Sequence, residues 1–501
     1  MANGKGDKAS SHWYTDPNPL LDGIPDFQTP DAFLENLSFS PLAGLDVKSL
    51  SFMQRHELLK GEKTPLIPTT KSFRAAMTWF GMLRVGLQVR NPLRAEARRR
   101  YWSVLNAVAA NVREIPRSPT PGIAVHIAKG PTGTAKTVTA RRFCTMLGRQ
   151  RIDHGAMPAA GWNGLHQLVY LYTDLSHDGS RGGFLIALLS RMDEALGTTS
   201  AIDLPRQYRT VERLAVATVV RLIAHYTGII FIDEGQLRNL MNSNQADVMQ
   251  LFLLSLMNSG IPLVLLGNER AFDWISFSQD LTRLNVVPSE YFHPVGAIDH
   301  PDTEQDWNAL ETGITSYYLL NDPPIGLAEC KRLLRDFSGG IGRIGLTVWT
   351  SAQTIALYAG RPQLTPDDLR AAYEDDAFRD MRQLADGFSK RLPELLLSYP
   401  DVAVDYYAKH WNKPIPSAPE VKKPDVPGEL QTAQGKQVRR PRRRSGPAML
   451  KAEQTRKKNE DAARESLQQS LSSEDMRREG VKNLHLRGLD ALRSRTNSQD
   501  T

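Results

Sequence analysis

Cysteine is nearly absent from this sequence, which holds two in 501 residues, Cys144 and Cys330. Two thiols cannot build a disulfide framework or, by themselves, a structural zinc site. Long apolar runs are missing too, since none approaches the roughly 18 residues that a membrane-spanning helix needs. Residues 1–11 are polar and lack the apolar core of a secretory signal. We therefore expect a protein of the reducing cytoplasm with no membrane partner.

Excess charge is also missing from most of the chain. Residues 421–501 carry 19 Lys and Arg against 11 Asp and Glu, whereas the preceding residues carry 43 against 44. The net charge of +7 therefore belongs to the C-terminal end, which includes the run Arg439-Arg440-Pro441-Arg442-Arg443-Arg444. Such a flexible basic segment is typical of contacts with nucleic acid or with an acidic partner surface, although a solvated tail without function has the same composition.

Length and composition predict several domains, because 501 residues exceed the size of one hydrophobic core. Proline-rich segments and shifts in composition mark the boundaries. The predicted order is an extended N-terminal arm (1–70), a helical region (71–115), an α/β domain (116–300), a helical lid with following helices (301–412) and a basic, largely disordered tail (413–501). The arm either wraps its own domain or docks a partner.

Continuous apolar runs alternate with amphipathic segments in the middle of the chain. This alternation predicts a parallel sheet covered by helices on both faces. The predicted strands are 123–128, 167–174, 228–234, 263–266 and 291–295. Helical periodicity predicts helices at 71–87, 94–112, 136–147, 181–196, 210–225 and 247–257, and in the lid at 304–320, 327–337, 343–358 and 366–373.

A glycine-rich turn joins the first strand to the next helix. Its residues are Gly130, Pro131, Thr132, Gly133, Thr134, Ala135, Lys136 and Thr137, followed by Val138. Backbone N–H groups in such a turn can bind phosphates, with Lys136 on the β and γ oxygens and the Thr137 hydroxyl on Mg²⁺. These nine residues are the predicted nucleotide-binding loop, and a plain glycine-rich turn is the alternative. Ala135 replaces a glycine of the motif, which costs little at negative φ and much at positive φ.

Polar side chains end the third and fourth predicted strands. Asp233 and Glu234 close the third strand, where Asp233 could hold Mg²⁺ with Thr137 and Glu234 could polarise an attacking water. Asn268 follows the fourth strand, where it could orient water or touch the γ-phosphate. The alternatives are that Asp233 and Asn268 merely cap the helices that follow them.

These elements, in this order, resemble an AAA+ P-loop ATPase, and several segments are similar to TnsC, of the TnsC/TniB family of ATP-dependent regulators of targeted DNA transposition. The resemblance covers about residues 15–380, more weakly ahead of the α/β domain, and departs at Ala135 and Gly235. It rests on residues 169–171, 176–180, 195–197, 232–236 and 260–267.

The resemblance implies a bacterial, DNA-associated ATPase that binds ATP and Mg²⁺ and forms rings or filaments on duplex DNA. It implies a link between a target selector of the TniQ/TnsD kind and the transposase TnsB, often with the endonuclease TnsA. Hydrolysis, which we expect to be slow, would disassemble the oligomer. The family analogy favours contact of the basic tail with the transposase or endonuclease.

Further residues are implied only by the resemblance. Arg283 stands where such ATPases place an arginine finger, and Arg343 could report nucleotide state from the lid. Arg270 and Arg335 are rival arginines. The implied DNA-contacting residues would bind phosphates independently of sequence, although the arginines among them could simply be solvated. They are Ser176, His177, Arg181, Arg206, Arg209 and Thr210.

Two other functions remain open. One is an AAA+ remodeller or initiator that acts on a protein client, which would differ in whether duplex DNA or protein stimulates hydrolysis. The other is a nucleotide-gated scaffold with negligible turnover, which a large gain in turnover from Ala135→Gly would support.

Overall fold

The computed structural model describes residues 12–61, 64–106, 125–174, 181–235, 260–269 and 287–416, together with Leu253, Leu256 and Ala271. The chain divides into two compact units, 1–419 and 420–501, and all described residues lie in the first. Nearly all of the predicted tail, from residue 417 on, is therefore outside the described part. Within that part, no helix is both long and apolar enough to cross a membrane.

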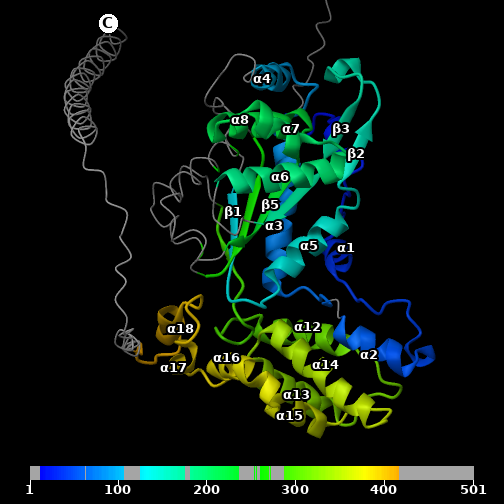
Figure 1. Ribbon diagram of the computed structural model, residues 1–501, viewed down its shortest axis with the longest axis vertical. Helices are drawn as coiled ribbons and strands as arrows, with labels where there is room; N and C mark the ends of the chain where they lie inside the picture. Colours follow the sequence, from blue (N-terminus) through cyan, green and yellow to red (C-terminus); the bar gives the residue numbers. More distant parts are fainter. Residues whose placement is uncertain are drawn as a thin grey trace, which may run out of the picture. The chain divides into compact units, whose positions relative to one another are not determined.

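A five-stranded parallel sheet forms the centre of the α/β domain, as the sequence predicts (Figure 1). The strand order is β4-β5-β6-β1-β7. Strands β1 and β6 pair residue for residue from Val125↔Leu263 to Lys129↔Gly267. The bounds are β1 Val125–Lys129, β4 Tyr170–Asp174, β5 Ile229–Gly235, β6 Leu263–Gly267 and β7 Glu290–Tyr291.

Both faces of the sheet are buried, which explains why its central strands are continuously apolar. Alternate residues of β5 enter different cores: Ile230 and Ile232 on one face, Ile229 and Phe231 on the other. The first core includes residues of α6 and α8, and the second includes residues of α3 and α5. These helices are α3 Thr70–Val89, α5 Lys136–Met146, α6 Arg181–Leu196 and α8 Val211–Ala224.

The predicted strand 167–174 is wrong as a single strand. Its first part belongs to β3 (Leu165–Leu168), which pairs antiparallel with β2 (Arg151–His154) in a separate two-stranded sheet. Only its second part, β4, joins the parallel sheet. The apolar run continues through both strands because Leu168 and Val169 are both buried, so the sequence pattern has no break there. Helix α7 (Ser200–Gln207) was not predicted either, and it contains Pro205.

The N-terminal segments are more helical than expected. The predicted extended arm contains α1 (Pro30–Leu37) and α2 (Phe52–Lys60), with 3₁₀ turns η1 (Pro19–Leu21) and η2 (Val47–Ser49). Both helices begin at side-chain caps, Thr29 and Ser51, which accept hydrogen bonds from free N–H groups of the first turn. Helix α4 (Ala95–Leu105) follows α3.

The described residues after β7 form helices and the segments that connect them. Their buried side chains form a separate hydrophobic core that includes Trp349, Tyr317 and Tyr407. Leu59 of α2 also belongs to this core, so the N-terminal segment contributes to the lid as well. The helices are α12 Thr303–Ser316, α13 Leu327–Ser338, α14 Gly342–Tyr358, α15 Pro366–Glu374, η5 Asp376–Phe378, α16 Arg379–Ser389, α17 Pro393–Leu396 and α18 Val404–His410.

Candidate functional site

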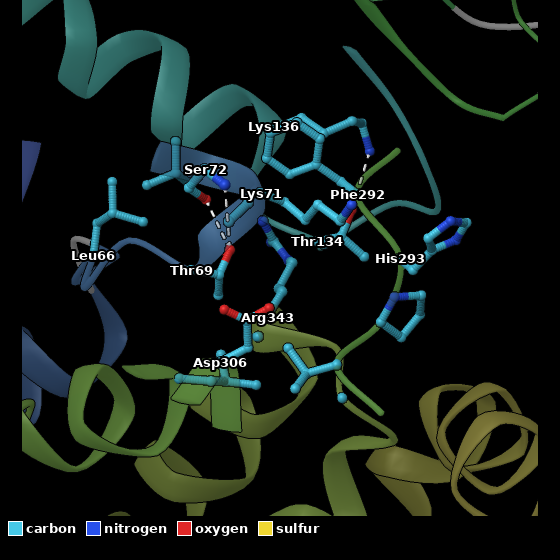
Figure 2. A pocket seen from close by; sticks show the side chains of 18 of the residues that line it. Leu66, Thr69, Lys71, Ser72, Thr134, Lys136, Phe292, His293, Asp306 and Arg343 are labelled. Atoms are coloured by element: carbon cyan, nitrogen blue, oxygen red, sulfur yellow. Dashed lines mark hydrogen bonds between the residues drawn. The ribbon is translucent and has the colours of Figure 1, made fainter. Parts of the chain in front are cut away.

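A cavity of about 700 Å³ lies where the carboxyl ends of the parallel strands meet the lid. Its lining includes the start of α3 with the residues before it, the glycine-rich loop, the ends of β5 and β6, the segment after β7 and the lid helices. Figure 2 shows labelled side chains from four of these parts around the one space: Thr69 and Lys71, Thr134 and Lys136, Phe292 and His293, and Asp306 and Arg343. The cavity therefore sits at the strand edge where open α/β sheets bind ligands.

Two glycines allow the loop to fold against its neighbours. A Cβ atom on Gly130 would lie 2.3 Å from the carbonyl oxygen of Phe292. A Cβ atom on Gly133, whose φ is +88°, would lie 2.9 Å from Ile341 Cγ2. Inside the loop, the Thr134 hydroxyl donates to the Pro131 carbonyl at 2.8 Å. The loop is thus held in a tight turn that has no room for a side chain at either glycine position.

Ala135 has a φ of 69° and a ψ of 11°, the left-handed conformation. Of the two possible signs of φ at this position, the positive one is unfavourable for alanine, because the Cβ atom of an L-residue is crowded there. The Ala135 carbonyl accepts hydrogen bonds from both the backbone N–H and the hydroxyl of Thr139, each at 2.8 Å. The start of α5 therefore holds Ala135 in a strained conformation that glycine would adopt freely.

Lys136 is the first residue of α5 and is 7% exposed. Its Nζ donates to the carbonyl oxygens of Gly130 at 2.8 Å and Pro131 at 2.7 Å. Burial lowers the pKa of Lys136 to about 8, although the carboxylates of Asp233, Glu269 and Asp401 oppose the shift. A buried cation in a glycine-rich turn at the start of a helix makes a site for an anion.

Asp233 ends the buried part of β5 and is 5% exposed. It accepts a hydrogen bond from the hydroxyl of Tyr172 on the neighbouring strand β4. Burial and the charge of Asp233 raise the pKa of Tyr172 well above its usual value. The guanidinium of Arg141 lies 5.4 Å from the centre of the same ring. Glu234 follows Asp233 in β5, but its side chain lies outside the described part of the structure.

Asn268 follows β6 and lies beside the loop. Its Oδ1 accepts a hydrogen bond from the Thr132 hydroxyl at 3.3 Å. Thr132 Oγ1 also lies 3.5 Å from Asp401 Oδ2, which belongs to the segment between α17 and α18. Lys136, Asp233 and Asn268, predicted as one constellation, therefore line one cavity. Asp401, a carboxylate that the sequence did not indicate, contacts Thr132 of the loop.

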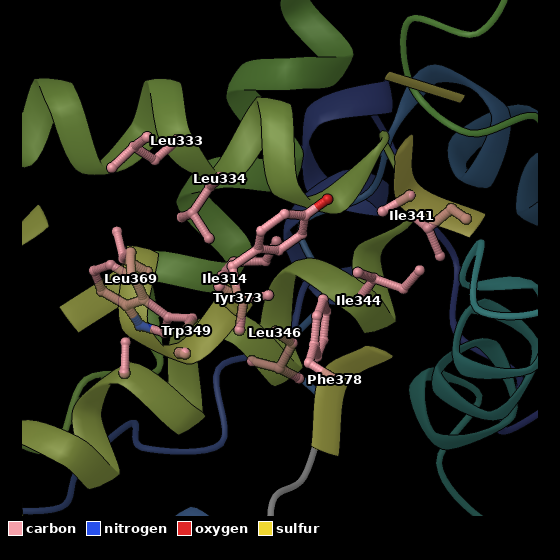
Figure 3. Close-up of a cluster of buried hydrophobic side chains, with 14 of the residues drawn as sticks. Ile314, Leu333, Leu334, Ile341, Ile344, Leu346, Trp349, Leu369, Tyr373 and Phe378 are labelled. Atoms are coloured by element: carbon pink, nitrogen blue, oxygen red, sulfur yellow. The ribbon is translucent and has the colours of Figure 1, made fainter. Parts of the chain in front are cut away.

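The lid reaches the loop through Arg343, in the first turn of α14. Its backbone N–H donates to the Gly133 carbonyl at 3.2 Å, and its side chain lines the cavity. Further along α14, Ile344, Leu346 and Trp349 are buried in the lid core, which fixes the helix (Figure 3). Arg343 is thus positioned by the lid and lies against the loop.

The segment before α3 also lines the cavity, and sequence reasoning missed it. Leu66 pairs with Phe39 through two backbone hydrogen bonds, of 2.7 and 2.8 Å. The N–H of Thr70 donates to Asp306 Oδ1 of the lid at 2.6 Å, and Lys71 forms an ion pair with Glu290 at 3.1 Å. No local motif marks these residues, because their part in the cavity comes only from contacts distant in the chain.

The other predicted site residues lie apart from the cavity or outside the described residues. Arg270, Arg283, Ser176 and His177 are outside, as is the side chain of Arg181. Arg335 forms ion pairs with Glu311 and with Glu304, the latter at 3.1 Å. The Thr210 hydroxyl accepts a hydrogen bond from the Arg213 N–H, which caps α8, whereas Arg206 and Arg209 are exposed.

Residues 124–275 match the family model of an AAA domain. The chain therefore contains an AAA domain, and its fold is that of an AAA+ P-loop ATPase: a parallel sheet flanked by helices, followed by a helical part. Among curated proteins, none matches this chain.

Several solved structures are distantly similar. The ADP form of Aeropyrum pernix ORC2 protein is 14% identical, over 65% of this chain and 85% of its own, with a TM-score of 0.35. Cdc6p from Pyrobaculum aerophilum is 15% identical, over 65% and 83%, with a TM-score of 0.36. RuvB from Thermotoga maritima is 14% identical, over 62% and 83%, with a TM-score of 0.31.

Proposed function

We propose that this chain is an ATPase that binds ATP with Mg²⁺ in the cavity and uses the nucleotide as a switch. The observation that carries the proposal is the convergence of Lys136, Asp233 and Asn268 on one cavity beside a tightly turned loop. The site suits a triphosphate, since Gly130 and Gly133 allow the tight turn of the loop and Lys136 supplies a buried positive charge.

Magnesium fits the same site. Mg²⁺ is usually held by one or two protein groups together with phosphate oxygens and water. Thr137 and Asp233 would supply those groups, and the bound ion would neutralise charge on the phosphates. Among the described residues no group of three or more His, Cys, Asp or Glu side chains could hold a metal alone, so the phosphates would complete the site.

The remaining residues have proposed roles around this centre. Glu234 would polarise the attacking water, and Asn268 would orient it. Arg343 would sense the nucleotide from the lid, since its N–H already bonds to the loop at Gly133. Arg283 would act on the nucleotide of a neighbouring subunit.

At the finer level, we propose a regulator of targeted transposition that assembles on duplex DNA. The support is the sequence resemblance to TnsC, together with the AAA domain. Assembly would link a TniQ/TnsD-like selector to TnsB, and possibly to TnsA. Contacts with DNA phosphates would weaken as salt rises. They would come from Ser176, His177, Arg181, Arg206, Arg209 and Thr210.

The test is electron microscopy of the full chain mixed with duplex DNA and a non-hydrolysable ATP analogue. We expect rings or filaments threaded by DNA that require the nucleotide and are lost in Lys136→Ala. Lys390→Ala is the matched control, because it removes the same charge from an exposed side chain. Nucleotide binding is measured on the same samples by fluorescence titration.

The results of these two measurements distinguish the transposition proposal from the ATPase proposal. Nucleotide binding with particles that ignore DNA would overturn the transposition proposal and favour an AAA+ remodeller or initiator with a protein client. Failure of the wild-type chain to bind nucleotide would overturn the ATPase itself.

A second candidate is a nucleotide-gated scaffold with negligible turnover. The left-handed Ala135 favours it, because strain in the loop must be maintained whenever the phosphates are bound. A phosphate-release assay on Ala135→Gly decides between the two, since a large gain in turnover would indicate that the alanine restrains hydrolysis.

A further inference from the structure

The segment 393–411, which we call the clasp, returns from the lid to the α/β domain. It contains α17, Asp401 and α18. Glu269, next to Asn268, is 2% exposed and accepts hydrogen bonds from the Ala403 N–H at 2.6 Å and from the Tyr407 hydroxyl. The clasp is therefore bonded to the end of β6, immediately beside a residue of the proposed nucleotide site.

Buried side chains hold the clasp in place. Tyr407 is fully buried, and its hydroxyl lies 3.1 Å from His293 Nδ1, on the segment that lines the cavity after β7. The indole N–H of Trp411 donates to the Ala297 carbonyl at 2.7 Å. The ring of Tyr406 stacks on His293 at 5.4 Å and also lines the cavity.

This anchoring brings Asp401 to the loop. Its Oδ2 lies 3.5 Å from Thr132 Oγ1, which also bonds to Asn268. Its charge acts on Lys136, together with the charges of Asp233 and Glu269. Asp401 therefore lies beside Thr132 of the loop, which in the proposed site is the end of the terminal phosphate.

We propose that Asp401 sets the preference of this site between nucleoside di- and triphosphates. A carboxylate beside the terminal phosphate repels it, because like charges a few ångströms apart disfavour each other even where water partly screens them. A diphosphate lacks that terminal group and is repelled less. This inference rests on the proposed function, since it requires a nucleotide in the cavity.

The repulsion also acts on the clasp. Triphosphate binding and the contact of the clasp with the loop oppose each other, and such coupling is reciprocal. A bound triphosphate therefore weakens that contact by the same factor by which the contact weakens triphosphate binding.

The first measurement compares the dissociation constants of ADP and a non-hydrolysable ATP analogue for the full chain. We expect Asp401→Asn to shift the ratio of affinities toward the triphosphate by roughly tenfold, which corresponds to about 1.4 kcal/mol. Glu394→Gln, an exposed carboxylate of α17, removes the same charge away from the loop and should leave the ratio unchanged.

An unchanged ratio in Asp401→Asn would overturn the inference while leaving nucleotide binding intact. Absence of binding of either nucleotide to the wild-type chain would overturn the proposed function and the inference with it. Equal shifts in both variants would show a general effect of charge and would also overturn the role of Asp401.

The second measurement is hydrogen exchange of backbone amides in residues 393–411. The triphosphate analogue should speed exchange there relative to ADP in the wild-type chain, and Asp401→Asn should remove most of that difference. Equal exchange with both nucleotides in the wild-type chain would overturn the reciprocal effect. Native-like exchange in the core of the variant confirms that it is folded.

Discussion

Ala135 shows how one methyl group can affect a whole loop. In a motif that usually has glycine there, its left-handed backbone carries a cost of about 1–2 kcal/mol. The bonds from Thr139 to its carbonyl and the tight turns at Gly130 and Gly133 leave the residue no ordinary conformation. The surrounding contacts hold Ala135 in this strained conformation.

Replacing Ala135 by glycine should therefore stabilise the protein. We expect Ala135→Gly to raise the free energy of unfolding by about 1 kcal/mol, because the relief of strain exceeds the greater entropy of glycine in the unfolded chain. Urea denaturation measures the change. Gly148→Ala makes the opposite change at an open left-handed position with φ of +80°, and it should lower the free energy of unfolding. A loss of stability in Ala135→Gly would contradict the strain.

At the scale of elements, helix α3 belongs to the core of the α/β domain although it precedes it in sequence. Trp79 is fully buried between Phe143 and Phe231, with ring centres 5.7 and 5.3 Å away. Its indole N–H donates to His126 Nδ1 at 2.9 Å. On the same helix, a Cβ atom on Gly86 would lie 2.7 Å from Pro262 Cγ, which shows how closely α3 approaches the sheet.

Truncating the Trp79 side chain should make the α/β domain less stable. We expect Trp79→Ala to lower the free energy of unfolding by about 3–5 kcal/mol, since it leaves a large cavity and His126 without its donor. Met77→Ala, at a position 40% exposed on the same helix, should change it by less than about 0.5 kcal/mol. Equal effects of the two substitutions in urea denaturation would mean that α3 is not part of the cooperative core.

At the scale of the whole molecule, the buried His126 and the half-buried His293 make stability depend on pH. Burial lowers the pKa values of His126 and His293 to about 4, and the charges of Lys71 and His410 add to the shift of His293. Both histidines are thus neutral in the folded chain over the range in which the unfolded chain binds protons. Their contribution to stability is present above about pH 6.5 and is lost as the pH falls toward 4.

Between pH 7 and pH 5 we expect each histidine to lower the free energy of unfolding by about 2 kcal/mol. Urea denaturation at half-unit steps of pH measures the slope. His126→Asn and His293→Asn should each remove part of it, whatever they cost at pH 7. A slope that is the same in both variants as in the wild-type chain would contradict the assignment.

The sequence alone predicted the central strands along the chain, the loop after the first of them and the polar residues at the strand ends, but not the order of the strands in the sheet. These features are contiguous: an apolar run, then glycines, a lysine and a hydroxyl, or an apolar run that ends in Asp233 or before Asn268. Local patterns of this kind survive in the structure because a parallel sheet brings the carboxyl ends of its strands to one edge. The helix 181–196 was predicted with the bounds that the structure has.

Only the tertiary structure decided how distant segments complete the cavity. Leu66 and Lys71 line it, and Asp401 contacts the loop at Thr132, because of packing between parts of the chain far apart in sequence, for which no local pattern exists. The left-handed φ of Ala135 and the division of residues 167–174 between two sheets likewise depend on neighbours, Thr139 in one case and β2 in the other. Contacts over long sequence separations set these features, whereas composition and periodicity report only the local chain.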